Sequence, residues 1–232
     1  MANRSSITSM KRNVLRGTDS TEELSGLIRQ ACLVAKDSAF NVREFVRDSS
    51  KMAFLAVKDC EKELDRIERD VDERITSAIT QVSETQAREL LACLKFIIDL
   101  ERIGDLLWSA VKRLHEIRSA VSRNDTSDLL EMSSAVEHML ERIYRGFVER
   151  DLQDAHWVLR ADAHIDQACA AVFRRHLETG NRHHGEHSTN LLFVAQAFER
   201  AGDHAKNLSE ELVHLIEGRS VRHELKRRQP GA

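Results

Sequence analysis

The sequence predicts an all-α fold of two tandem, sequence-related three-helix bundles, with six long antiparallel helices. One proline, Pro230, and nine glycines occur among the 232 residues, which is too few for a fold of short strands and tight turns. Apolar residues recur every three or four positions over long stretches, and no stretch alternates with period two over the length of a strand. Motifs of the first half also recur, in the same order, in the second half.

Breaks in the apolar periodicity predict helices over residues 20–48, 51–81, 84–117, 125–149, 152–179 and 188–217. The stretch Ser83-Glu84-Thr85-Gln86 fits a capping box at the start of the third helix. Asn124 or Asp125 suits the N-cap of the fourth helix, and Ser188 suits that of the sixth. Gly218 is expected at the C′ position that ends the sixth helix.

Three motifs carry the internal repeat, at offsets of 102, 101 and 98 residues. They are Arg43-Glu44-Phe45-Val46 with Arg145-Gly146-Phe147-Val148, Glu61-x-x-x-Asp65 with Asp162-x-x-x-Asp166, and Glu101-Arg102-Ile103-Gly104-Asp105 with Glu199-Arg200-Ala201-Gly202-Asp203. The offsets differ by about one helical turn, which a shortened loop would absorb. We therefore expect repeats at residues 19–120 and 121–218, between a basic N-terminal segment, 1–18, and a basic C-terminal tail, 219–232.

Charge is distributed unevenly along the chain, although its total is small. The formal net charge is −3, yet each basic end carries +4 and the body between them carries −11. The basic ends fit either solvated tails or weak contacts with anionic lipid or nucleic acid. The acidic body and an aromatic content of 5% over the whole chain argue against a nucleic-acid-binding protein.

Cysteine usage and hydropathy indicate a cytoplasmic protein. The four cysteines stand far apart and form no CxxC pair, as expected of reduced thiols. The longest stretch without Asp, Glu, Lys or Arg is His187–Phe198, far shorter than the roughly 18 apolar residues of a membrane span. The basic N-terminus lacks the apolar core of a signal peptide. Any membrane association is therefore expected to be peripheral, through partners.

Eight acids interrupt or border the apolar stripes of four predicted helices. They are Glu61, Asp65, Glu101, Asp105, Asp162, Asp166, Glu199 and Asp203. In the third helix, Ile97 leads to Glu101 and Asp105 by steps of four, which places both carboxylates on the face that should be buried. Glu61 and Asp65 lie beside their stripe rather than within it. Acids four residues apart repel each other, and their burial is costly unless a cation compensates for it.

Two kinds of compensation are open. Arg102 and Arg200, one in each motif, could pair with acids, although each follows its glutamate by one position and points away from it. Alternatively, carboxylates from two facing helices could hold a metal ion, and their duplication at matched positions favours this interpretation. Oxygen ligands suit Mg, Mn, Ca or ferric iron. A ferritin-type di-iron site would need two Glu-x-x-His motifs, whereas this sequence has one, Glu211-x-x-His214.

Motifs of the common catalytic sites are missing from the sequence. It contains no GxxxxGK[ST], no GxSxG, and no GxGxxG after a strand. The histidine-rich stretch His183–His187 is more typical of a solvated, glycine-flanked linker than of a metal site. We therefore expect a binding protein rather than an enzyme.

Two segments, Ile98–Asp105 and Phe198–Glu211, resemble the signature helices of the PhoU family. Val57–Glu73 and Asp162–Gln167 fit that family's preceding helices, so the resemblance covers about residues 20–218. It implies a PhoU-like fold of two three-helix bundles, in which the E/D-x-x-x-D acids ligate multinuclear iron or zinc clusters at the surface. The resemblance makes the acid pairs of the two signature helices the firmest ligands and the acids of the preceding helices secondary ones: Glu101, Asp105, Glu199 and Asp203, then Asp162, Asp166, Asp65 and Glu61.

The resemblance also implies a regulatory role. PhoU proteins act with the Pst phosphate transporter, here through its ATPase subunit, and with the PhoR sensor histidine kinase to restrain phosphate uptake and phosphate-starvation (Pho regulon) gene expression. A homodimer is expected. The alternative is a metal-free helical scaffold or chaperone-like interaction protein whose buried acids pair with arginines. A metal-dependent hydrolase comes third, because it would need an open coordination position and a general base.

Overall fold

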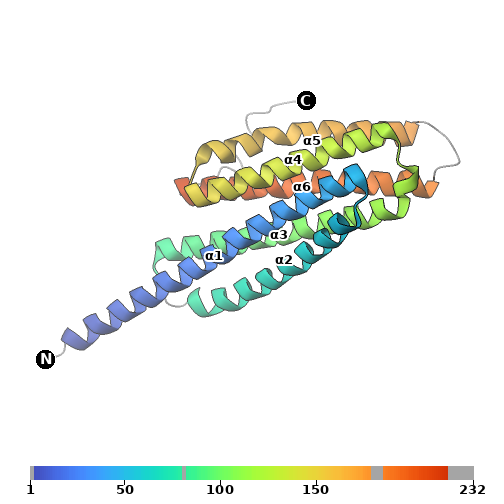
Figure 1. The fold of residues 1–232 in the computed structure, drawn as a ribbon. Coiled ribbons are helices and arrows are strands. Elements are labelled where there is room, and N and C mark those ends of the chain that lie inside the picture. Colours follow the sequence, from blue (N-terminus) through green and yellow to red (C-terminus); the bar gives the residue numbers. More distant parts are fainter. Residues whose placement is uncertain (1–2, 80–81, 179–184, 219–232) are drawn as a thin grey trace.

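The computed structural model describes residues 3–79, 82–178 and 185–218, and for residues 3–20, 162 and 178 it describes the backbone alone. The described residues contain helices and no strand, so the all-α prediction is confirmed for them. The helices are α1 Asn3–Asp48, α2 Lys51–Ala78, α3 Glu84–Ile117, α4 Arg123–Glu149, α5 Leu152–Glu178 and α6 Gly185–Glu217, with a short 3-10 helix, η2 Arg118–Ala120, after α3. In Figure 1, α1, α2 and α3 form one three-helix layer, and α4, α5 and α6 form the other.

Helix ends follow local capping chemistry, and this corrects two of the predicted caps. The capping box at Ser83 and Gln86 is confirmed, with the Ser83 N–H donating to Gln86 Oε1 at 2.9 Å. The fourth helix is instead capped by Ser122, whose hydroxyl accepts from the Asp125 N–H at 3.2 Å, so neither Asn124 nor Asp125 is the N-cap. Asp125 is the third residue of α4 and accepts a hydrogen bond from the Ser122 hydroxyl. This contact favours a helix that begins at Arg123 over one that begins at Asp125.

Of the predicted ends of α6, the C-terminal end is confirmed and the N-cap is not. Helix α6 begins at Gly185, so Ser188 lies in its first turn instead of capping it. Gly218 does end α6, with φ at 72° and its N–H donating to the His214 carbonyl at 2.9 Å. Helix α1 begins at Asn3 rather than near residue 20, because the basic N-terminal residues continue the same helix.

The two layers meet along α3 and α6, which carry the longest runs of buried apolar side chains. Phe96, Leu100 and Leu107 on α3 and Phe198 on α6 are fully buried. The Phe96 ring also packs 5.0 Å from that of Phe147 on α4, which joins the layers through a tilted aromatic pair. The apolar core is therefore continuous between the two repeats.

Polar contacts set the register of α3 against α6. Lys95 Nζ donates to Glu211 Oε2 at 2.9 Å, His204 Nδ1 lies 2.7 Å from Asp99 Oδ1, and Arg113 Nη1 donates to Asn190 Oδ1 at 3.2 Å. Residue numbers rise along α3 as they fall along α6, so the two helices run antiparallel. We call this line of contacts the α3–α6 seam.

A buried ion pair closes the corner between α4 and α5. Asp154 is 1% exposed and lies 2.7 Å from Arg142 Nη1 and 2.6 Å from Arg145 Nη2. Burial by itself would raise the pKa of Asp154, but the hydrogen bonds from the two arginines outweigh it and hold that pKa below its ordinary value. Compensation of a buried acid by arginine is thus present in this fold, at this corner.

Replacing Gly146 with alanine is expected to destabilise this corner by about 1–2 kcal/mol, because overpacking forces neighbouring atoms to shift. A Cβ at Gly146 would lie 2.6 Å from Leu212 Cδ2 and 3.2 Å from the Asp151 carbonyl oxygen. Urea denaturation measures the loss. The control is Gly26→Ala on α1, where the nearest atom is 3.7 Å away and better helix propensity should add about 0.5–1 kcal/mol. Equal effects of the two substitutions would contradict the close approach at Gly146.

Candidate metal centre

Three of the predicted acids come together between α2 and α3. One carboxylate oxygen each from Asp65, Glu101 and Asp105 lies within 4.8 Å of the other two. Gly104 lies between the two acids of α3, and a Cβ there would lie 2.6 Å from Leu64 Cδ1, so the missing side chain lets the helices approach at this point. We call these three residues the acid cluster.

Glu101 is the most buried member of the acid cluster. Its side chain is 13% exposed, and its Oε2 is buried without a hydrogen-bond partner among the described residues. Burial, and next the negative charge of Asp105, raise the pKa of Glu101 to about 7. A buried carboxylate oxygen without a partner, facing two further carboxylates, is a place where a bound cation would relieve both the desolvation and the repulsion. The residues present therefore fit a metal ion with oxygen ligands.

Arginine pairing, the other predicted compensation, is loose at this site. Arg102 Nε lies 3.5 Å from Glu101 Oε2, and Arg102 Nη1 lies 3.7 Å from Asp105 Oδ2. The Arg102 side chain is also 58% exposed, so water screens both contacts. Close pairing with arginine lowers the pKa of a buried acid, as the two arginines do at Asp154. The pKa of Glu101 is instead raised, so Arg102 does not compensate for its burial.

Two more acids of α2 border the cluster, and one of them was not predicted. Burial first, and then Asp65 and Asp105, raise the pKa of Glu61, which lies at the edge of the cluster. The charge of Glu68 also contributes to the raised pKa of Glu101. Spacing could have identified Glu68, because it follows Asp65 by three residues and Glu61 by seven and so shares their helix face. The pair Glu61-x-x-x-Asp65, found through the internal repeat, ends at Asp65 and does not include Glu68, which begins a further E-x-x-x-D spacing with Asp72.

The second repeat differs from the first at the matching place. Burial, followed by the charges of Glu199 and Asp166, raises the pKa of the Cys169 thiol to about 11, so these two acids lie near that thiol. Asp203 is exposed, and the side chain of Asp162 lies outside the described residues. Among the described side chains, the acid cluster of the first repeat is the one group of three whose ligand atoms lie within 4.8 Å. A second metal site remains a prediction.

The remaining predicted candidates have structural partners or lie elsewhere. Glu211 pairs with Lys95, and its Oε1 also lies 3.4 Å from His214 Nδ1, so the single Glu-x-x-His motif belongs to the α3–α6 seam. His183 and His184 lie outside the described residues. His204, whose pairing with Asp99 across 105 residues no local pattern indicates, joins the repeats beside the acid cluster.

Comparison with known protein families determines the relationship of the chain. A family model described as the PhoU domain matches residues 28–114 and again residues 129–212. The chain belongs to the PhoU family. The two PhoU domains coincide with the two three-helix layers, and together they cover well over half of the sequence.

Relatives and solved structures extend this result. A Burkholderia protein named phosphate-specific transport system accessory protein PhoU homolog is 31% identical over 70% of this chain and 72% of its own length. The protein of the same name from Clostridium acetobutylicum is 24% identical over 86% of this chain and 94% of its own length. The crystal structure of the phosphate transport system regulatory protein PhoU from Streptococcus pneumoniae superposes with a TM-score of 0.77 at 18% identity, covering 88% of this chain and 99% of that one. This last similarity establishes the PhoU fold.

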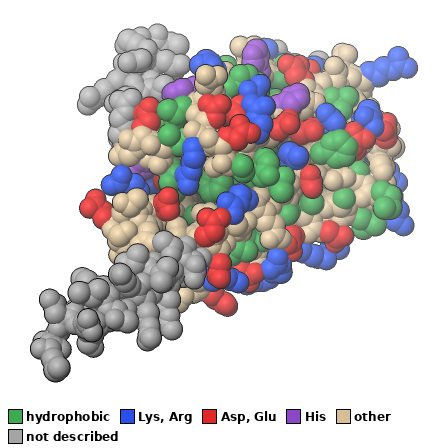
Figure 2. Space-filling model, turned by 60° about the vertical axis from the view of Figure 1, so that its left-hand side comes forward, with side chains coloured by type: hydrophobic (Ala, Val, Ile, Leu, Met, Phe, Trp, Pro, Cys, Tyr) green, Lys and Arg blue, Asp and Glu red, His purple; other side chains and the backbone are tan. Residues whose placement is uncertain are grey.

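The surface of this PhoU protein is of mixed charge. Acidic and basic side chains are interspersed over the face drawn in Figure 2, with apolar side chains between them. No helix in the described parts of the chain combines the length and the hydropathy that crossing a bilayer requires.

Proposed function

We propose that this PhoU protein is a metal-binding regulatory adaptor that acts by binding rather than by catalysis. It restrains phosphate uptake and phosphate-starvation signalling by contacting the ATPase subunit of the Pst phosphate transporter and a PhoR-type histidine kinase, as a homodimer in the cytoplasm. The observation that carries the proposal is the pair of PhoU domains over most of the chain. The curated relatives named as accessory proteins of phosphate-specific transport support it.

The metal part of the proposal rests on the acid cluster. Asp65, Glu101 and Asp105 would hold the ion, with Glu61 and Glu68 at its edge. In the second repeat, the corresponding residues would be Asp162, Asp166, Glu199 and Asp203. Iron or zinc in multinuclear clusters is the proposed content, and the oxygen ligands also suit Mg, Mn or Ca. A bound cation would neutralise the clustered carboxylates and fasten α2 to α3.

Elemental analysis tests the metal part. Protein purified without added metal is expected to carry iron or zinc, and a variant with Glu101, Asp105, Glu199 and Asp203 all changed to alanine is expected to lose it. The control is Asp59→Ala combined with Glu116→Ala, which removes exposed acids from α2 and α3 outside the cluster. Equally low metal in wild type and variant would reject the metal part and favour a metal-free scaffold.

Partner contact and regulation are tested separately. In a strain with the gene deleted, phosphate uptake and expression of a phosphate-starvation reporter should rise under phosphate-rich conditions. Reintroducing the wild-type gene should return both to their original levels. Affinity capture of the purified chain should retain the transporter ATPase or the kinase. An unchanged reporter together with failed capture of both partners would reject the adaptor role even if metal is bound.

A further inference from the structure

A cleft of about 370 Å³ lies on the α3–α6 seam, next to the acid cluster. Side chains of both repeats line it, among them Arg102 and Lys112 from α3 and Arg200 and His204 from α6. The two arginines occupy the same place in the two copies of the signature motif. The cleft therefore brings together the matched arginines of the duplicated motif.

The cations of this cleft have donor capacity to spare. Lys112 Nζ lies 5.1 Å from the centroid of the Trp108 ring, a cation–π contact that leaves its three N–H groups available. Among the described residues, Arg200 makes neither a hydrogen bond nor an ion pair, and the contacts of Arg102 with its own acids are 3.5 and 3.7 Å long. Guanidinium groups that are not closely paired with carboxylates can donate two parallel N–H hydrogen bonds to an oxyanion.

The charge balance of the cleft favours an anion. Arg102, Lys112 and Arg200 supply three permanent positive charges, against two carboxylates in the lining, Glu61 and Asp105. The two carboxylates lie on the side of the acid cluster, where a cation would offset them. The lining therefore carries one more positive than negative charge, even before a cation offsets the carboxylates.

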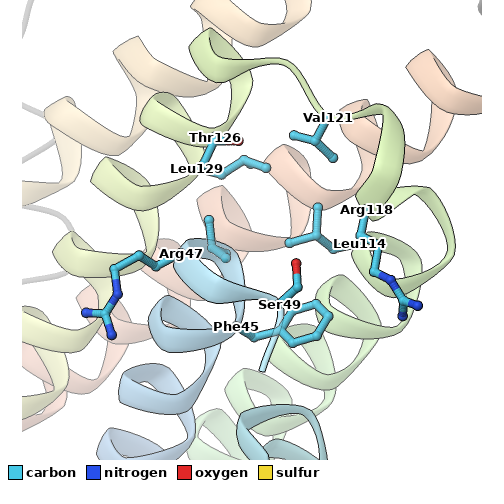
Figure 3. Close-up of a pocket in the computed structure, with 9 residues that line it drawn as sticks. Phe45, Arg47, Ser49, Leu114, Arg118, Val121, Thr126 and Leu129 are labelled. Carbon is cyan, nitrogen blue, oxygen red and sulfur yellow. The ribbon is translucent and has the colours of Figure 1, made fainter. Parts of the chain in front are cut away.

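A second pocket of the fold shows the contrast. It measures about 140 Å³ and lies where α1 ends, between the two repeats. Figure 3 shows its two arginines, Arg47 and Arg118, extending away from the pocket, while Phe45 and Leu114 line it. Arg47 is also engaged by Asp48 at 2.9 Å. Arginines near a pocket therefore do not by themselves make an anion site in this fold. Those of the seam cleft differ in lining it together, with contacts to acids no shorter than the 3.5 Å and 3.7 Å of Arg102.

We propose that the seam cleft binds free inorganic phosphate, held by Arg102 and Arg200 from the two repeats and by Lys112. A tetrahedral oxyanion can accept from two guanidinium forks at once, while the lysine adds a point charge. This gives the chain a ligand of its own beyond the proposed adaptor role. Because the two arginines lie on different repeats, phosphate would strengthen the contact between the repeats.

Tryptophan fluorescence tests this proposal on the full chain. The chain has two tryptophans, so a Trp157→Phe background leaves Trp108, beside the cleft, as the reporter. Titration with potassium phosphate at constant ionic strength should give a saturable change. Arg200→Gln and Lys112→Gln should each weaken phosphate binding about tenfold or more, because each removes a charge-assisted contact. Arg174→Gln, which changes an exposed arginine on α5, should leave the affinity unaltered.

Each outcome decides between phosphate and the alternatives. The absence of a saturable response to millimolar phosphate, with and without added iron or zinc, would overturn the proposal. So would equal weakening by Arg174→Gln, which would indicate diffuse charge attraction. O-phosphoserine serves as a second titrant, and tighter binding of this monoester would assign the cleft to phosphorylated partners instead of free phosphate. Since the assay needs no partner protein, phosphate binding can succeed where the adaptor role fails, and the reverse.

Discussion

Truncating Leu100 to alanine is expected to lower the free energy of unfolding by about 3–5 kcal/mol, the cost of removing a large apolar side chain from a packed core. Leu100 is 0% exposed and lies near the middle of α3, the helix that contacts both its own layer and α6. The loss combines the transfer free energy of the side chain with the cavity that it leaves. Helices packed on several sides cannot collapse to fill such a cavity.

Urea denaturation followed by circular dichroism measures this loss, and the same helix offers a matched control. Leu91 on α3 is 49% exposed, so Leu91→Ala should change stability by less than about 0.5 kcal/mol. Both substitutions remove the same atoms and introduce the same helix former. Similar losses for the two variants would contradict the placement of α3 at the centre of the fold.

Glu101→Gln is expected to separate the two interpretations of the acid cluster, because they predict opposite signs. In chelator-treated protein at pH 8, the substitution should stabilise the fold by about 1–2 kcal/mol. The raised pKa of Glu101 corresponds to roughly 3 kcal/mol without screening, and partial solvent access reduces this figure. If the buried acid were instead held by arginine, its loss would leave an unpaired cation and destabilise the fold.

The pH dependence of folding stability also tests the raised pKa of Glu101. The pKa of Glu101 rises from its ordinary 4.5 to about 7 in the folded protein, so between these values the folded state binds more protons than the unfolded state. Stability therefore falls as the pH rises through this window. The wild type should lose this contribution between about pH 4.5 and 7, and Glu101→Gln should not. The difference between the two proteins isolates Glu101 from the other titrating groups.

Metal addition should reverse the order of stability. Iron or zinc at about one hundred times its Kd should stabilise the wild type by about 2.7 kcal/mol and have little effect on Glu101→Gln. The control is Glu116→Gln, an exposed acid of α3, which should behave as the wild type does with and without metal. A Glu101→Gln protein that is less stable than the wild type after chelation, and equally stabilised by metal, would contradict the proposed role of the acid cluster.

Local patterns predicted those features whose causes are local. The capping box at Ser83 and the end of α6 at Gly218 depend on residues within one helical turn, and both are confirmed. The predicted start of α4 was wrong by two residues because Ser122 and Asp125 both favour caps, and their mutual hydrogen bond decides the choice. The duplicated motifs similarly predicted the two three-helix units, because a repeat is visible in the sequence itself.

Features that depend on residues far apart in the chain could not be predicted from the sequence. Helix periodicity predicted a buried face for Glu101 and Asp105, which is right for Glu101, whereas the Asp105 side chain is 46% exposed. Periodicity could not show that Asp65, beside its stripe, would meet them across α2 and α3. The sequence shows that Arg102 and Arg200 could partner the acids, whereas their common place in one cleft depends on how the two repeats pack. Spacing specifies a helix face, and packing decides what that face meets.

The α3–α6 seam also records how far the two halves have diverged. With the motif offset of 98 residues, the counterpart of the Lys95–Glu211 ion pair is Phe193 with Arg113, and in the structure the Arg113 guanidinium lies 4.6 Å from the Phe193 ring centroid. The duplicated positions still touch, but through different chemistry. If two copies of the first repeat met across such a seam, Lys95 would face Arg113 and like charges would oppose each other. The two repeats are therefore not interchangeable across the seam, because its contacts favour pairing of the first repeat with the second over pairing of two first repeats.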